Sequence, residues 1–212
     1  KTHDMLQLDP AKLEEREQYK LMTGCIVPRP IALVTTLGVL GPNAAPFSLF
    51  NMIGSDPPLL MISVGNQGDG SEKGTIQNLQ HRPEFVVHIC DGAMAERVNI
   101  CATDYPHGDN ELEKAGFTAI PSVKVAPPRI AEAPVHMECR LERIIKFGTR
   151  HNVVFGEVLL FHFRDGIVNE RYHVDFAKLN PMARLSGSLY GNIRDTFTLD
   201  RKFLGDVPKQ LT

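Results

Sequence analysis

The chain has 212 residues, a length that allows one or two domains. Its 23 Lys and Arg against 25 Asp and Glu give a net charge of −2, which excludes nucleic-acid binding driven by bulk positive charge. The 42% hydrophobic and 23% charged residues are typical of a globular protein. No run approaches the roughly 20 apolar residues of a membrane helix, and no signal peptide is recognisable, so we expect a cytoplasmic protein without a membrane partner.

Four cysteines are scattered along the chain without a C-x-x-C pair: Cys25, Cys90, Cys101 and Cys139. A zinc site or a disulfide framework would be the functional interpretations of this set. The alternative is reduced thiols that pack in the core of a cytoplasmic protein. Because free cysteine is among the most often buried residue types, we favour reduced, mostly buried thiols.

The first predicted element is a helix that begins at Asp9-Pro10. Asp can cap a helix, Pro fits the first helical position, and the acidic residues that follow suit the helix dipole. This helix is expected to end near Met22, because Gly24 follows it.

Segments rich in β-branched and aromatic residues predict the strands. In chain order the candidates cover residues 31–36, 43–52, 59–64, 85–90, 135–142 and 153–163. The alternation over 135–142 is the clearest, with apolar residues at every second position, as in a half-buried antiparallel strand. Pro46 inside the second candidate indicates an edge strand or an interruption.

The segments between these strands predict the remaining elements. Helices are expected over 73–81 and 93–101, and a surface excursion over 103–123 is expected to hold a short helix near 111–115. Asp165-Gly166 is a hairpin signal that follows the last long strand. Many short strands with turn residues between them suggest one antiparallel barrel with peripheral helices.

Familiar catalytic and metal-binding motifs are missing from the sequence. The eight histidines form no H-E-x-x-H and no ligand-spaced cluster, and Ser186 lies in no G-x-S-x-G elbow. The glycines at 65–70 match neither a G-x-G-x-x-G fingerprint nor a P-loop. We therefore assign no catalytic side chain and no metal ion.

One arrangement suits a phosphate group. A strand ends at Val64, a glycine-rich loop follows, and Ser71, Lys73 and Thr75 open a helix. Free N–H groups, a helix dipole, a cation and hydroxyls would together bind an anion. The alternative is an ordinary helix after a mobile loop.

The segment 43–50 is also unusual, because two alanines and a proline leave its backbone exposed on one side. Unpaired N–H and C=O groups there could hydrogen-bond the edge of a flat heterocycle. The alternative is simply an irregular edge strand.

Taken in order, these pieces resemble the flavin reductase-like, FMN-binding split-barrel family over roughly residues 19–190. The resemblance is carried by Tyr19-Lys20-Leu21-Met22-Thr23-Gly24, Pro28-Arg29-Pro30-Ile31-Ala32-Leu33-Val34-Thr35-Thr36, Gly41, Asn43, Ala45-Pro46-Phe47-Ser48, Phe50 and Asp56-Pro57-Pro58. It implies a mainly β protein, a six-stranded antiparallel split barrel with peripheral helices. It also implies a homodimer with one FMN per subunit in a groove at the dimer interface.

The resemblance further implies a single domain over 1–212, with a barrel core of about 25–170 and a C-terminal segment of about 175–212 that closes over the flavin. Gly74 stands where the family's Lys-Asp-Thr phosphate motif has Asp. The implied cofactor-binding residues are Thr35, Thr36, Asn43, Ala45, Pro46, Ser48, Ser63, Val64, Lys73, Thr75, Asn78, Arg184 and Tyr190.

His151 resembles the histidine of a family motif linked to nicotinamide binding, although Thr149-Arg150 replace its Gly-Asp. The resemblance therefore implies an FMN-dependent oxidoreductase with NADH or NADPH as electron donor and a small acceptor or a partner oxygenase as acceptor. Such an enzyme needs no catalytic side chain for hydride transfer, because that chemistry belongs to the cofactor. The alternative from another class is a non-enzymatic FMN-binding electron carrier or sensor.

Overall fold

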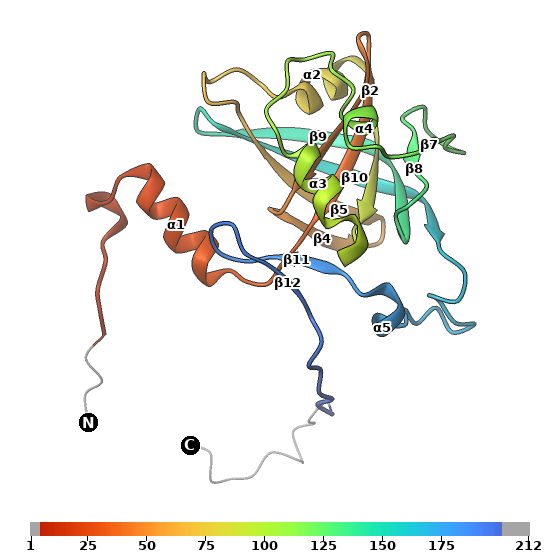
Figure 1. Cartoon of the computed structure of the whole chain (residues 1–212). Coiled ribbons are helices and arrows are strands. Elements are labelled where there is room, and N and C mark those ends of the chain that lie inside the picture. Colours follow the sequence, from red (N-terminus) through yellow and green to blue (C-terminus); the bar gives the residue numbers. More distant parts are fainter. Residues whose placement is uncertain (1–4, 201–212) are drawn as a thin grey trace.

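The computed structural model describes residues 5–200, and its largest element is a seven-stranded antiparallel sheet that curves into a barrel (Figure 1). The strands are, in spatial order, β3 (Gly41–Phe47), β2 (Ala32–Gly38), β6 (Glu84–Ile89), β9 (Val135–Phe147), β10 (His151–Phe163), β5 (Pro58–Gly65) and β4 (Phe50–Ser55). The predicted mainly β, antiparallel architecture is confirmed, with seven strands in this sheet where six were expected.

The prediction of one strand over 43–52 is wrong, because that segment forms the end of β3 and the start of β4. The chain bends at Ser48-Leu49, and the two halves pair at opposite edges of the sheet, β3 with β2 and β4 with β5. The expected edge position of Pro46 is confirmed. Pro42 and Pro46 have no N–H to donate to a second neighbour, so β3 is suited to the edge of the sheet.

The sheet encloses one apolar core and carries another on its outside. The inner core includes Val34, Ile62, Phe85 and Val154, all about 2% exposed or less. Helix α2 (Gly74–His81) closes one end of the barrel with Ile76 and Leu79. The predicted helix at 73–81 is therefore confirmed.

The outer core lies under α3 (Ala95–Cys101) and α4 (Glu111–Lys114). A short 3₁₀ turn, Gly92–Met94, precedes α3 and completes the helix expected over 93–101. The short helix near 111–115 is confirmed, but the segment around it is not only a surface excursion. Leu112 and Phe117 pack into this core, because the apolar residues of 103–123 fold back onto the sheet.

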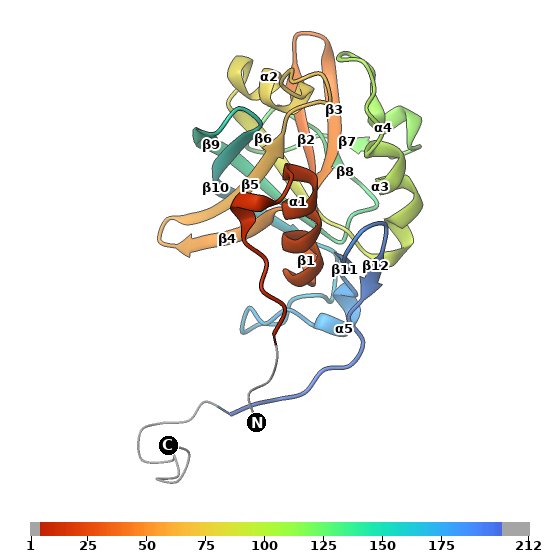
Figure 2. The same cartoon turned by 90° about the vertical axis from the view of Figure 1, so that its left-hand side faces the viewer.

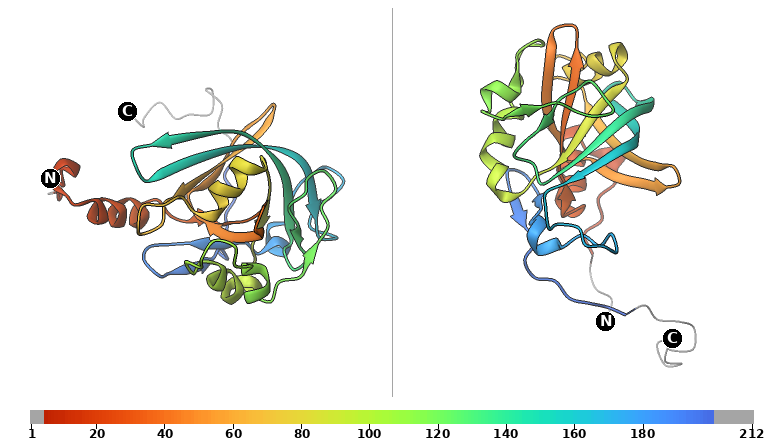
Figure 3. Two further views of the ribbon diagram at one scale, coloured as in Figure 1. Left: turned by 90° about the horizontal axis from the view of Figure 1, so that it is seen from above. Right: turned by 90° about the vertical axis from the view of Figure 1, so that its right-hand side faces the viewer.

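Helix α1 (Glu15–Cys25) lies to one side of the barrel, as the view from above shows most clearly (Figure 3). It begins at Glu15 and not at Asp9, because Asp9 instead caps a separate 3₁₀ turn, Pro10–Lys12. Thr23 is the one buried residue of α1. No helix within residues 5–200 has both the length and the apolar character that crossing a membrane requires.

A three-stranded sheet joins the two ends of the described chain below the barrel, with β11 in the middle. Its strands are β1 (Arg29–Pro30), β11 (Met182–Arg184) and β12 (Tyr190–Asn192), and α5 (Phe176–Leu179) precedes it. The buried guanidinium of Arg29 donates to the carbonyl oxygens of Thr23 at 2.6 Å, Ile26 at 2.7 Å and Leu185 at 2.9 Å. Arg29 thus ties α1 to the C-terminal segment.

The hairpin expected at Asp165-Gly166 is wrong. Both neighbours of β10 are already taken by β9 and β5, so the chain cannot return alongside it. A turn does form, but Val168 pairs only with Val174, in an isolated bridge. A further small sheet joins β7 (Ala119–Ile120) to β8 (Arg129–Ile130).

The four cysteines are free thiols, and Cys90, Cys101 and Cys139 are buried while Cys25 is exposed. Burial raises the pKa of the Cys101 thiol to about 12. The expectation of reduced, mostly buried thiols therefore agrees with the structure.

His88 makes the stability of the fold depend on pH. Its fully buried ring accepts a hydrogen bond from the Ile130 amide at 3.0 Å and contacts the Leu33 carbonyl oxygen at 2.9 Å, a pairing that suits the neutral ring. Burial, and then the nearby His136, lower the pKa of His88 from 6.5 to about 3.

Because the unfolded chain binds this proton more readily, the stabilisation is present above pH 6.5 and is lost as the pH falls toward 3. We expect about 2 kcal/mol of unfolding free energy to be lost between about pH 6.5 and about pH 5 through this group. Urea unfolding at a series of pH values measures it, with His88→Gln as the variant that flattens the profile. An identical pH dependence in the two proteins would contradict the assignment.

Candidate functional site

A polar groove runs between the N-terminus of α2, strand β3 and the chain that follows α3, at the upper end of the barrel in Figure 1. Its walls come from segments far apart in sequence. The lining residues are Asn43, Ala45, Pro46, Gln67, Lys73, Gly74, Thr75, Cys101, Ala102, Thr103, Asp104, Tyr105, Pro106, His107 and Glu111. Five of the predicted cofactor-binding residues therefore line one groove.

The cationic end of this groove is the start of α2. Lys73 occupies the N-cap position, and within residues 5–200 no side chain caps this helix. Its ammonium group lies 3.2 Å from Asp104 Oδ1, and its side chain is one-third exposed. Uncapped first-turn N–H groups, the helix dipole and a reachable ammonium group are the donor set that a phosphate requires.

The position of the His107 ring accounts for Gly74, the residue at which this chain departs from the Lys-Asp-Thr pattern. A Cβ at position 74 would lie 2.9 Å from Cδ2 of the His107 ring, closer than such contacts normally allow. The His107 ring thus occupies the space beside position 74. The phosphate end keeps its cation and its hydroxyl, and the histidine stands where a side chain at 74 would have to go.

A hydrogen-bonded chain of side chains holds the floor of the groove. Thr75 Oγ1 donates to Asn43 Oδ1 at 3.1 Å, and Asn43 Nδ2 donates to Glu111 Oε1 at 2.7 Å. The second oxygen of Glu111 accepts from the Ala44 amide at 3.1 Å. Burial raises the pKa of the Glu111 carboxyl. The network fixes the rotamers of Thr75 and Asn43.

A second chain of hydrogen bonds lies behind the first. Asn78 Nδ2 donates to Thr36 Oγ1 at 3.0 Å, and His107 Nε2 lies 3.2 Å from Asn78 Oδ1. Thr36 and Asn78 are both almost fully buried. These two predicted residues therefore support the groove wall, and His107 is the member that reaches the groove itself.

Other predicted residues point away from the groove. Thr35 Oγ1 donates to the Pro128 carbonyl oxygen at 2.6 Å, and the Val64 side chain packs in the inner core. Ser48 lies in the bend between β3 and β4. Neither Thr35 nor Val64 lines the groove.

A separate apolar hollow of about 380 Å³ lies between α1 and strands β5 and β10, the region that faces the viewer in Figure 2. Its walls are mostly apolar and contain two of the predicted residues, Ser63 and His151. The lining residues are Tyr19, Met22, Thr23, Ile26, Arg29, Leu49, Ser63, Phe147, His151 and Val153. His151 opens β10 and pairs across to Gly65 at the end of β5.

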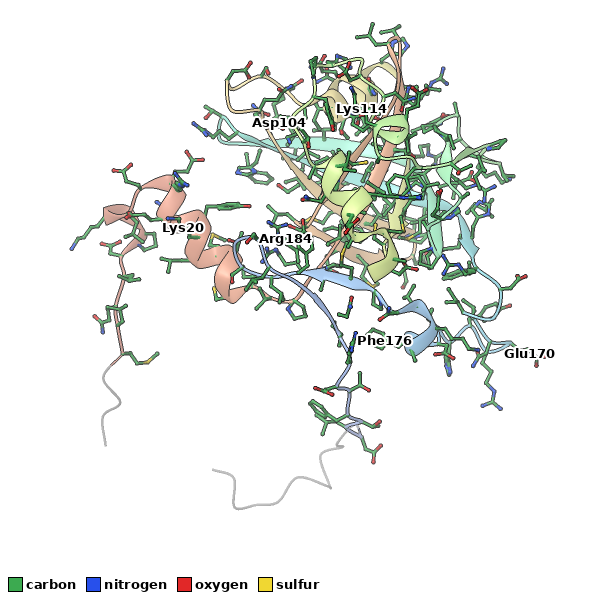
Figure 4. All side chains as sticks on the ribbon, viewed as in Figure 1. Lys20, Asp104, Lys114, Glu170, Phe176 and Arg184 are labelled. Atoms are coloured by element: carbon green, nitrogen blue, oxygen red, sulfur yellow. The ribbon has the colours of Figure 1, made fainter. Side chains whose placement is uncertain are left out.

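Arg184 lies on β11, well below Asp104 of the groove in Figure 4, and Tyr190 begins the neighbouring strand β12. The Arg184 guanidinium stacks over the Tyr190 ring, 4.3 Å from its centre, and donates to the Gly187 carbonyl oxygen at 2.6 Å. Neither residue lines the groove or the apolar hollow. Within one subunit the structure does not bring them to Lys73.

The sequence interpretation missed Gln67, Asp104, His107 and Glu111. Glu111 follows an Asn that caps a short helix, which is a local signal for the helix but not for the groove. Nothing local marks Asp104 or His107, since both reach the groove only through the path of the chain between α3 and α4.

Comparison with known proteins identifies the class. A model of the flavin reductase like domain matches residues 23–179. The chain therefore belongs to the flavin reductase-like family of split-barrel proteins, and it is a flavin-dependent oxidoreductase.

The similar proteins span nearly the whole chain. A protein of Halalkalibacterium halodurans is 39% identical over 202 residues, which cover 92% of this chain and 96% of the relative. The structure of nitrilotriacetate monooxygenase component B from Bacillus cereus matches with a TM-score of 0.90 and 35% identity, covering 93% of this chain and all of that one. The structure of Pseudomonas fluorescens 2-nitrobenzoate 2-nitroreductase NbaA matches with a TM-score of 0.88 and 36% identity over 97% of this chain and all of that one.

Proposed function

We propose that this protein is an NAD(P)H-dependent flavin reductase that binds FMN in the polar groove and passes electrons to a small acceptor or a partner oxygenase. The observation that carries the proposal is the cationic, uncapped start of α2 at one end of that groove. The two similar solved structures support both kinds of acceptor, since one is a monooxygenase component and the other is a nitroreductase.

The phosphate end favours FMN over a flavin without a phosphate. A phosphomonoester carries a charge of about −1.5 to −2 at neutral pH. Lys73 is now paired with Asp104, whose side chain is two-thirds exposed, and an exposed pair of this kind is weak. Lys73 can therefore exchange the Asp104 carboxylate for a phosphate without a large loss.

The groove offers the flavin a path along β3. From Lys73 it runs past Thr75 and Asn43 to Ala45 and Pro46, on the edge strand β3. The ring system would then lie near the bend at 48–49. That position adjoins the apolar hollow, since Leu49 is part of the wall of the hollow.

The bound flavin supplies the hydride chemistry, so the protein's residues bind, orient and shield. Lys73 and the first turn of α2 compensate the phosphate charge. The Thr75–Asn43–Glu111 network keeps the floor of the groove in one geometry, which lowers the ordering needed on binding. The apolar walls around Leu49 and Val153 exclude water from the ring end.

A homodimer completes the proposal. Exposed apolar residues outside both cavities lie on α1 and β4, including Leu21, Met52 and Ile53. An 11-residue helix with one buried residue is marginal alone in water, which supports packing of α1 against a second copy. Arg184 and Tyr190, far from Lys73 in their own subunit, would then serve the partner's flavin. Sedimentation that gives only the monomer mass would contradict the proposed homodimer.

His151→Ala tests the donor assignment. We expect the apparent KM for NADH or NADPH to rise about fivefold to tenfold, roughly the value of one neutral hydrogen bond or ring contact, with FMN affinity unchanged. Steady-state oxidation of both nucleotides measures it, and His173→Ala, an exposed histidine outside both cavities, is the matched control. An unaltered KM would remove the role of His151. A bound flavin that neither nucleotide reduces would favour a carrier instead.

A further inference from the structure

A second hollow lies next to the apolar one, and it is charged. It has a volume of about 370 Å³ and lies between the start of α1 and the adjoining ends of β5 and β10. Its lining residues are Glu15, Arg16, Tyr19, Gly65, Asn66, Arg150 and His151. Tyr19 and His151 line both hollows, so the two share a wall, and together they form a double cavity with an apolar end and a charged end.

The charged end is built for an anion. Arg16 and Arg150 bring two positive charges against the single carboxylate of Glu15. Arg150 Nε lies 3.5 Å from Glu15 Oε2, and both side chains are at least 60% exposed. Exposed pairs of this kind contribute little, so a ligand can replace Glu15 at Arg150. Arginine is suited to that exchange because its planar fork binds phosphate oxygens in pairs.

The apolar end is built for a flat ring. Leu49, Phe147 and Val153 form walls next to the place where the β3–β4 bend would hold the flavin ring. A ligand that fills both ends must therefore carry an uncharged ring and, beyond it, an anionic group. The charges on its tail must be separate from those of the FMN phosphate, because Lys73 lines the groove and does not line the charged hollow.

We propose that the electron donor binds across this double cavity, with its dihydronicotinamide ring in the apolar hollow and its pyrophosphate at Arg16 and Arg150. This inference rests on the proposed function and adds the residues that recognise the charged half of the donor. Tyr19 and His151, at the junction, define where the ring half ends and the phosphate half begins. Helix α1 is then a wall of the donor site.

The test compares two donors that share the ring and differ in charge. NADH carries the pyrophosphate, whereas N-benzyl-1,4-dihydronicotinamide is neutral. In the FMN-loaded protein, Arg150→Ala and Arg16→Ala should each raise the KM for NADH about tenfold, and the double variant should raise it more. The KM and kcat for the neutral donor should stay within about twofold of the wild-type values, a window well below one lost charge-assisted hydrogen bond.

Matched variants separate charge from structure. Arg171→Ala removes an exposed arginine at the far side of the molecule, beside Glu170 in Figure 4, and should change neither donor. Glu15→Gln removes the competing carboxylate and should lower the KM for NADH about twofold, as for a weak exposed pair. Added salt should raise the KM for NADH in the wild-type protein and much less in the double variant.

Three outcomes would overturn the proposal, and each is distinct. Equal losses with both donors would show that the arginines act only on the fold. An unchanged KM for NADH in the double variant would show that the pyrophosphate lies elsewhere, while the proposed function stands. A wild-type protein that binds FMN but oxidises neither NADH nor NADPH would overturn the proposed function itself, and this inference with it.

Discussion

Lys73→Ala is expected to weaken FMN binding at least about tenfold. A charge-assisted hydrogen bond contributes about 1.5–3 kcal/mol, and each 1.4 kcal/mol is a factor of about ten in affinity. The lower end applies, because the Lys73 side chain is one-third exposed and water screens its charge. Fluorescence titration of the flavin-free protein measures the dissociation constant.

Riboflavin is the control ligand, because it has the same ring and no phosphate. We expect Lys73→Ala to change riboflavin affinity by less than about twofold, a change below one net hydrogen bond. Asp104→Asn should have the opposite effect and raise the affinity for FMN slightly, because the Lys73 ammonium group then has no carboxylate partner to give up. Equal losses for FMN and riboflavin in Lys73→Ala would refute the phosphate assignment.

Arg29→Ala is expected to release α1 and the C-terminal sheet while the barrel remains folded. The Arg29 guanidinium makes three hydrogen bonds to carbonyl oxygens of these segments, and the residue is 6% exposed. Hydrogen bonds to a charged group contribute about 1.5–3 kcal/mol each, so the local opening free energy should fall by at least about 3 kcal/mol. Hydrogen exchange of 15–25 and 182–192 measures it.

The same variant should also lower NADH turnover, because α1 forms one wall of the double cavity. Arg29→Lys should restore little, since an ammonium group cannot hold three carbonyl oxygens in the geometry of the guanidinium fork. Arg140→Ala, which removes only an exposed pair with Glu157, is the control. Unchanged hydrogen exchange of α1 in the Arg29→Ala variant would contradict the role of Arg29 in holding α1 to the C-terminal sheet.

The alternation at 135–142 located part of β9, but the expectation of a half-buried strand is wrong for its first half. His136 and Glu138 are buried as well, because the chain before β8 covers that face and the amides of Val123 and Lys124 donate to the Glu138 carboxylate. The segment 43–52 could not be divided from its composition alone. Its break at Ser48-Leu49 follows from pairing with β2 on one side and β5 on the other, which only the closed sheet determines.

The sequence predicted which segments form the candidate site better than it predicted which way their side chains point. Lys73 and Thr75 were found because a glycine-rich loop before a helix is a local pattern, and both do line the groove. Thr35 and Val64 lie on strands, as expected, but the Thr35 hydroxyl donates to the Pro128 carbonyl oxygen and the Val64 side chain packs in the inner core, so neither side chain lines the groove. Strand membership follows from composition, whereas the face that a residue presents depends on register.

Asp104, His107 and Glu111 could not have been found by pattern. They lie in a stretch without clear periodicity, and their positions depend on how 103–123 folds onto the sheet. His107 also explains Gly74, since the space that a side chain there would need is filled by the ring. The glycine at this position of the family motif therefore depends on His107, a residue that no sequence pattern near position 74 indicates.

The proposed function requires that this chain bind FMN in the groove at Lys73 and that a reduced pyridine nucleotide deliver electrons to the flavin. Its most direct test is to titrate the flavin-free protein with FMN and then to add NADH, and in a parallel sample NADPH, without oxygen in a stopped-flow spectrometer. We expect stoichiometric uptake of FMN followed by rapid loss of the yellow absorbance with at least one nucleotide. A well-folded protein that takes up no FMN would contradict it.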